Sequence, residues 1–132
     1  MNKIVAYCRI TDNALVLNGN RNFAPPVEGT GQVRLTNLYR ALGLTYPKFH
    51  KMDNVSKAGF LASELVLRSL NYNMEVPDSS TALVFANSSS SLDNDKRFQE
   101  TLAKNAYFPS PAVFVYTLPN IVTGEVAIRN KI

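Results

Sequence analysis

The stretch that decides the fold covers residues 109 to 129 and reads Pro109-Ser-Pro-Ala-Val-Phe-Val-Tyr-Thr-Leu-Pro-Asn-Ile-Val-Thr-Gly-Glu-Val-Ala-Ile-Arg129. Its first part, residues 109–116, is a short apolar run behind two prolines, which predicts an extended segment. Pro119 suits the first turn of a helix, so we expect a helix over residues 119–130. That helix is apolar apart from a few positions, and we expect Glu125 to lie on its exposed face.

Three further segments precede this stretch. Apolar residues recur at helical spacing over residues 55–71 and spread beyond one stripe, which predicts a buried helix with Ser56 as its N-cap. Residues 81–86 form a continuous apolar run between turn residues, which predicts a strand buried on both faces of a parallel or mixed sheet. Four serines at 88–91 follow, and the last of them is expected to cap a helix over residues 92–103.

The first fifty residues predict a hairpin and a short helix. Residues 4–10 and 14–17 have β-type composition and are separated by turn-forming residues. A loop rich in Pro and Gly leads to a short helix that Thr36 can cap and Gly43 can end. The alternation of strands and helices predicts an α/β fold, with a mixed sheet and packed helices, in one domain over residues 1–132.

Composition limits the classes of function. The chain has 132 residues, of which 45% are hydrophobic and 18% charged, as expected of one globular domain. The net charge of +4 comes from scattered basic residues without a dense run, which is typical of a mildly basic surface. If the charge serves a partner, the scatter favours an acidic protein over nucleic acid. No apolar stretch reaches the roughly 20 residues that span a bilayer, so we expect a cytoplasmic protein without a membrane segment.

Few residues are candidates for chemistry. Cys8 lies in an apolar β stretch, which is typical of a buried cysteine that acts as a small hydrophobic residue. His50 lies between lysines in a connector, which is typical of a surface histidine. No spacing of metal ligands is present, and no motif points to a cofactor. The stripe at residues 113–116 could line an acyl pocket or fill the core, and the pattern alone favours the core.

Three pieces of the chain carry a family resemblance. Residues 82–98, residues 111–120 and residues 124–129 resemble the strand, the segment ending in Pro-Asn and the following helix in the N-terminal half of β-ketoacyl synthases of the thiolase-like superfamily. Residues 53–70 are similar to an Ala-rich helix of that family, so the resemblance covers roughly residues 50–132. It implies a partial thiolase-like layer, corresponding to the N-terminal half only.

The resemblance also implies partners and site residues. It suggests substrates that are acyl chains on an acyl carrier protein, in fatty-acid, polyketide or polyene-type biosynthesis. Carried over by position, Phe114, Tyr116 and Asn120 are candidates for the acyl pocket or for a dimer interface. Val126 and Ile128 are expected on an apolar surface that a partner covers.

The departures from the family weigh against catalysis. The family's mechanism needs a cysteine thiolate and two histidines, or a histidine and an asparagine, and those positions lie downstream of the matched region. We therefore expect no catalytic residue here, and a protein that acts as a homodimer or with a second synthase subunit. Two alternatives stay open: an N-terminal fragment of an active condensing acyltransferase, and a binding module of unrelated function that shares only the fold.

Overall fold

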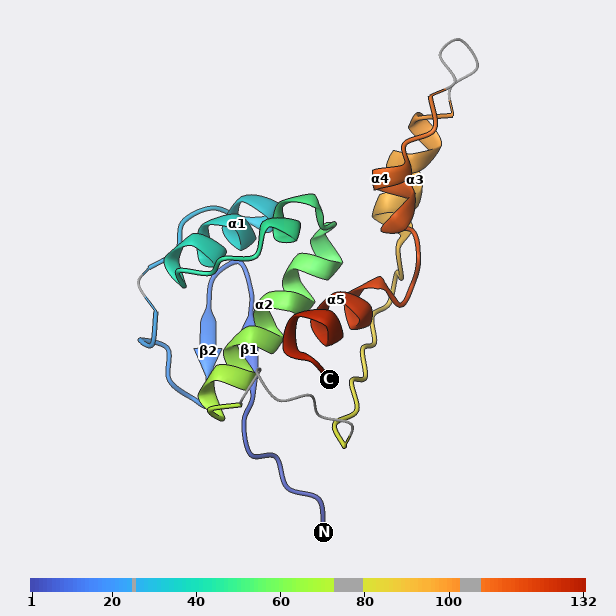
Figure 1. The fold of residues 1–132 in the computed structure, drawn as a ribbon. Helices are drawn as coiled ribbons and strands as arrows, with labels where there is room; N and C mark the ends of the chain where they lie inside the picture. Colours follow the sequence, from blue (N-terminus) through green and yellow to red (C-terminus); the bar gives the residue numbers. More distant parts are fainter. Residues whose placement is uncertain (25, 73–79, 103–107) are drawn as a thin grey trace.

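A computed structural model describes residues 1–24, 26–72, 80–102 and 108–132. These residues form a mixed α/β structure with five α-helices and a small antiparallel sheet (Figure 1). In chain order the elements are β1 (Cys8–Ile10), β2 (Leu15–Leu17), α1 (Gly31–Ala41), the 3₁₀ helix η1 (Pro47–Lys51), α2 (Asn54–Ser69), α3 (Leu92–Glu100), α4 (Pro111–Val115) and α5 (Ile121–Asn130).

The predicted hairpin is confirmed, but it is shorter than the sequence pattern indicates. Strands β1 and β2 pair antiparallel, with Cys8 opposite Leu17. The chain turns away directly after β2, where Asn18 and Gly19 have φ values of 51° and 83°. Gly tolerates this left-handed backbone without steric cost, and Asn is among the few other residues that adopt it readily. Because β2 stops there, no strand of the described part of the chain lies beside the apolar residues before Cys8.

Helix α2 is the centre of the core. It packs against α1, α5 and β1, which surround it on different sides (Figure 1). The ring of Phe49 is fully buried and stacks on Tyr39 with centroids 4.1 Å apart. The other buried members of this core cluster are Leu38, Leu44, Met52, Phe60, Leu61 and Tyr116. Burial of so many large apolar groups around one helix is the main force that holds these elements together.

The N-cap of α2 lies three residues before the predicted one. Asp53, not Ser56, is the N-cap, and its Oδ1 accepts a hydrogen bond from the Ser56 backbone N–H at 3.0 Å. A carboxyl group at this position satisfies an orphan donor at the positive end of the helix dipole. Ser56 is itself buried inside the first turn.

Helices α3 and α4 pack on each other and project away from the other elements (Figure 1). The Asn94 side-chain amide donates to the Val113 carbonyl at 2.6 Å, and the rings of Phe98 and Phe114 lie 5.3 Å apart. Asn94 is the one residue of α3 that is buried, and α4 has none. This pair of helices is therefore held mainly by its own contacts.

Two predicted extended segments are wrong. Within the described ranges, the two strands of the hairpin form the only sheet, and residues 81–86 belong to neither a helix nor a strand. Val84 is 89% exposed, so this run is not a strand buried on both faces. Residues 111–115 are helical because Ser110 accepts a hydrogen bond from the Val113 N–H at 3.3 Å and Pro111 fits the first helical position.

Candidate functional site

The three residues that the resemblance singles out lie in different environments. Phe114 is half-exposed on α4, and its ring packs on Phe98. Tyr116 is buried directly after α4 and points towards α5. Asn120 is the exposed N-cap of α5, although its side chain makes no capping hydrogen bond. Only Tyr116 is thus part of the interior.

Tyr116 leads to a buried carboxylate. Glu125 accepts a hydrogen bond from the Tyr116 hydroxyl at 3.2 Å and another from the Tyr46 hydroxyl at 3.0 Å. The expectation that Glu125 lies on an exposed face is wrong, because this side chain is buried against the core. Two hydroxyl donors provide the hydrogen bonds that make burial of a carboxylate tolerable.

A second buried carboxylate lies beside this cluster. Glu64 of α2 is 1% exposed, and its Oε1 lies 3.1 Å from Nε of Arg129 on α5. Its other oxygen lies 3.5 Å from Nε of Arg68, one helical turn along α2. The Arg129 guanidinium also lies over the Tyr46 ring, 5.6 Å from its centroid. The two carboxylates therefore belong to one polar network that joins α2, α5 and the loop before η1.

The tyrosines of this network remain protonated over the physiological range. Burial, the hydrogen bond to Glu125 and the charge of that carboxylate raise the pKa of Tyr46 to about 12, while Arg129 opposes the shift. Burial and the same carboxylate also raise the pKa of Tyr116. Both hydroxyls are therefore stable donors rather than general bases, and the network is suited to fixing α5 in place.

The cavity beside the serine-rich loop is too small for a ligand. Ser90 and Ser91 line a cavity of about 10 Å³ together with Asp53 and Tyr116. A single water needs roughly 10–15 Å³, so this space is filled by at most one water molecule. Ser91 is the N-cap of α3 as predicted, but its hydroxyl donates to Asp95 at 3.1 Å instead of accepting from the backbone.

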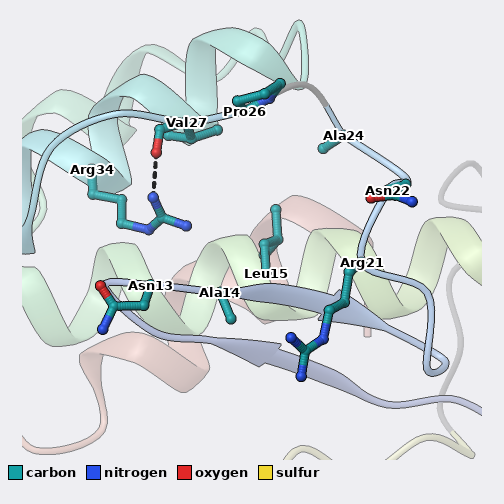
Figure 2. Close-up of a pocket in the computed structure, with 9 residues that line it drawn as sticks. All are labelled: Asn13, Ala14, Leu15, Arg21, Asn22, Ala24, Pro26, Val27 and Arg34. Carbon is teal, nitrogen blue, oxygen red and sulfur yellow. Dashed lines mark hydrogen bonds between the residues drawn. The ribbon is translucent and has the colours of Figure 1, made fainter.

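A larger cavity of about 480 Å³ lies between the hairpin and the loop that follows it (Figure 2). Arg34 of α1 contributes its positive charge, but its Nε donates to the Thr11 carbonyl at 2.9 Å and its Nη1 to the Val27 carbonyl. Figure 2 shows that the Arg21 side chain extends away from Arg34. The two guanidinium groups therefore do not converge on one ligand position, and Arg34 acts as a tie between the loop and the hairpin.

An apolar groove of about 400 Å³ lies on the other side of the hairpin. It is bounded by Cys8 of β1, by Ala62, Val66 and Leu67 of α2, and by residues 81–85. Of the described residues that line it, none is charged. Burial raises the pKa of the Cys8 thiol, which makes it a weaker nucleophile at neutral pH.

Comparison of the chain with family models, curated proteins and solved structures found no match. Of the helices in the described ranges, none combines the length and the apolar character needed to cross a bilayer. Nor do three or more histidine, cysteine, aspartate or glutamate side chains gather at a possible metal site in the residues that the structure describes.

Sequence reasoning found Tyr116 but not its surroundings. The ion pair between Glu64 and Arg68 could be predicted from the sequence, because opposite charges at i and i+4 of a helix are close enough to interact. The partnership of Tyr46 with Glu125 joins residues 79 positions apart and has no local sequence signal. Such contacts arise only when α5 has docked on α2.

Proposed function

We propose that this chain is a non-catalytic β-ketoacyl synthase-like protein of fatty-acid, polyketide or polyene-type biosynthesis, with a partial thiolase-like layer. It acts by binding a second copy of itself or another synthase subunit. The observation that carries this proposal is the apolar character of the exposed surface on the segments that resemble the family. Phe85, Phe114, Leu118 and Ile128 are each exposed there, and we infer that a partner covers part of this apolar surface.

The position of the thiol supports a non-catalytic role. The sequence contains one cysteine, and condensing chemistry of this family requires a thiolate nucleophile. Cys8 lies in a strand and not at a helix N-terminus, and burial raises the pKa of its thiol. A thiol in such an environment is poorly activated.

The surface residues expected at the interface divide into two groups. Ile128 is 64% exposed and stays a candidate, whereas Val126 is fully buried, so the expectation for Val126 is wrong. Phe114 and Asn120 are exposed and are candidates for direct contact. Tyr116 acts from the interior, by holding the junction between α4 and α5 against Glu125.

The 3₁₀ helix η1 is a candidate contact for an acidic acyl carrier protein. It carries Lys48, His50 and Lys51, all exposed, within five residues. A local concentration of positive charge steers the approach of an acidic partner, and salt screens such an attraction.

A condensation assay tests the catalytic part of the proposal. Purified chain, incubated alone with malonyl and acyl thioesters, is expected to give no steady condensation product. Turnover that the Cys8→Ala variant abolishes would contradict the proposal.

A pull-down with an acyl carrier protein tests the partner. Binding is expected at low salt and should weaken as salt rises. The Lys48→Glu/Lys51→Glu variant should weaken it by tenfold or more, whereas Lys3→Glu/Arg21→Glu, with the same change in net charge, should leave it nearly unchanged. Absence of binding at every salt concentration would favour the unrelated binding module instead.

A further inference from the structure

The outer edge of β1 is open. The Asn18 N–H donates to the Tyr7 carbonyl at 3.0 Å, and the Thr11 N–H donates to the Ala14 carbonyl at 2.8 Å. Because hydrogen-bonded and non-hydrogen-bonded positions alternate in an antiparallel pair, the backbone groups of Cys8 and Ile10 face away from β2. In the described part of the chain these outward groups have no backbone partner.

The apolar groove begins at this open edge. Its floor is α2, through Ala62 and Val66, and its far wall is formed by residues 81–85. The part of this wall from residue 82 to residue 85 makes no hydrogen bond to any described residue. Backbone groups that lack partners thus line both sides of one apolar slot, and a β-strand is the ligand that satisfies such groups in a regular array.

The chain itself carries a segment of the required chemistry. Residues 4–6 precede β1 and are apolar, and Ile4 and Val5 are 87% and 74% exposed. Side chains alternate along an extended chain, so Ile4 and Ala6 share the face of Cys8 and Ile10. Among the described residues of one molecule, Ile4 therefore has almost nothing to pack on.

We propose that two copies of this chain pair through the outer edges of β1, antiparallel about a two-fold axis at Tyr7. In this register Ile4 lies opposite Ile10 of the second copy, and Ala6 lies opposite its Cys8. All four residues direct their backbone groups to the outer edge, so the hydrogen bonds match in both directions. The N-terminal segment of each copy then lies in the apolar groove of the other, with Ile4 and Ala6 over α2.

The arrangement explains why the occupant is a second copy and not a small apolar ligand. A lipid or other hydrocarbon would fill the groove but leave the backbone groups of β1 unpaired, which is costly away from water. A second copy supplies hydrogen bonds and at the same time buries its own Ile4. The interface rests on the proposed function only for the expectation that the chain pairs, and it requires no acyl chemistry.

The first test measures the molecular mass of the full chain in solution over a range of concentrations. The chain should be a dimer that dissociates on dilution. Ala6→Pro removes an N–H that the interface uses and should raise the dissociation constant by about tenfold or more, because two symmetry-related bonds are lost. Val5→Pro is the matched control, since the N–H of residue 5 faces away from the interface, and it should have a much smaller effect.

A second test fixes the register. In Ala6→Cys, the new thiol lies opposite Cys8 of the second copy, and mild oxidation with Cu(II)–phenanthroline should form a covalent dimer. Val5→Cys carries its thiol on the opposite face and should cross-link far less. Circular dichroism of each variant checks that it is folded.

Three results would overturn the interface: a monomer at all concentrations, an equal effect of the two proline variants, or equal cross-linking of the two cysteine variants. Carrier-protein binding is scored separately. A dimer that binds no carrier protein would contradict the carrier-linked function but leave this interface standing. A monomer that binds carrier protein would contradict this interface but leave the carrier-linked function standing.

Discussion

At the scale of single residues, the burial of Glu125 matters most for the stability of the fold. It places a carboxylate in the interior of a chain whose α5 is otherwise mostly apolar. The hydroxyls of Tyr46 and Tyr116 both donate to it, from segments far apart in the sequence. The three side chains depend on one another, because removing the acceptor leaves two partly or fully buried donors unsatisfied.

We predict that Glu125→Ala lowers the free energy of unfolding by at least about 2 kcal/mol, since a lost partner costs about 1–3 kcal/mol for each stranded buried donor. Glu125→Gln keeps one acceptor oxygen and should cost less. Urea unfolding followed by circular dichroism measures both. A loss below about 0.5 kcal/mol for Glu125→Ala, as for an ordinary surface change, would show that the hydrogen bonds are not formed in solution.

Alkaline pH is predicted to weaken the fold through the same tyrosines. The pKa of Tyr46 is raised to about 12 and that of Tyr116 is also raised, whereas an unfolded tyrosine titrates near pH 10. Below about pH 10 both states hold the proton; above it only the unfolded chain releases it, so the free energy of unfolding falls as pH rises from about 10 to 12.

Urea unfolding at a series of pH values measures this dependence, and phenolate absorbance reports the titration. In the Tyr46→Phe/Tyr116→Phe variant the slope of stability against pH over this window should become shallower. An unchanged slope would assign the alkaline effect to other groups.

At the scale of elements, the sequence predicts α2, α3 and α5 well and extended segments poorly. Helix α1 begins at Gly31 with Thr30 as its N-cap, so the expectation that Thr36 caps this helix is wrong. Helix α2 was predicted within two residues at each end, because its apolar periodicity runs over four turns. Residues 81–86 and 111–115 are short apolar runs, and such runs do not distinguish a strand from a helix or an open segment. For residues 111–115 the local signal for a helix start was the Ser110–Pro111 pair, because Ser110 caps the helix and Pro111 fits its first turn.

The candidate site was less predictable than the helices. Tyr116 could be selected from a resemblance, but its hydrogen bond to Glu125 depends on how α4 and α5 are joined. The apolar groove depends on where residues 81–85 lie relative to α2, and no periodicity fixes that position. The site in the structure differs from the expected one because it depends on contacts between elements, which the sequence pattern does not predict.

A pair of helical glycines tests the placement of residue 85 against α2. A Cβ on Gly59 would lie 2.8 Å from Phe85 Cε1 and 3.0 Å from Val122 Cγ1, whereas a Cβ on Gly124 would meet nothing within 4 Å. Gly124→Ala should therefore stabilise by about 0.5–1 kcal/mol through helix propensity. Gly59→Ala should destabilise by about 1–2 kcal/mol, because overpacking outweighs that gain.

Thermal unfolding of the two alanine variants measures this difference. The informative result is the sign: stabilisation by Gly59→Ala equal to that by Gly124→Ala would mean that Phe85 does not pack on α2 in solution.

At the scale of the whole molecule, stability is unevenly distributed. The body built around α2 has a fully buried aromatic core and the Glu64–Arg129 pair that joins α2 to α5. Helices α3 and α4 project from that body and together bury a single residue, Asn94 (Figure 1). Regions with little buried apolar surface open at lower free energy than the core does.

We therefore predict that backbone amides of α3 and α4 exchange with deuterium at least about tenfold faster than those in the middle of α2, under conditions where the chain stays folded. Exchange followed by mass spectrometry of peptic fragments measures both regions in one sample, and the fragment containing Phe49 and Phe60 provides the slow reference. The same experiment distinguishes the two proposed interfaces. A carrier protein or synthase subunit bound at Phe114 should slow exchange in α4 selectively. Pairing of two copies through β1 should instead slow exchange at residues 4–10. Equal protection of α3 and α2 in the free chain would mean that α3 and α4 are packed against other parts of the protein in solution. The prediction that α3 and α4 are less stable than the body around α2 would then be wrong.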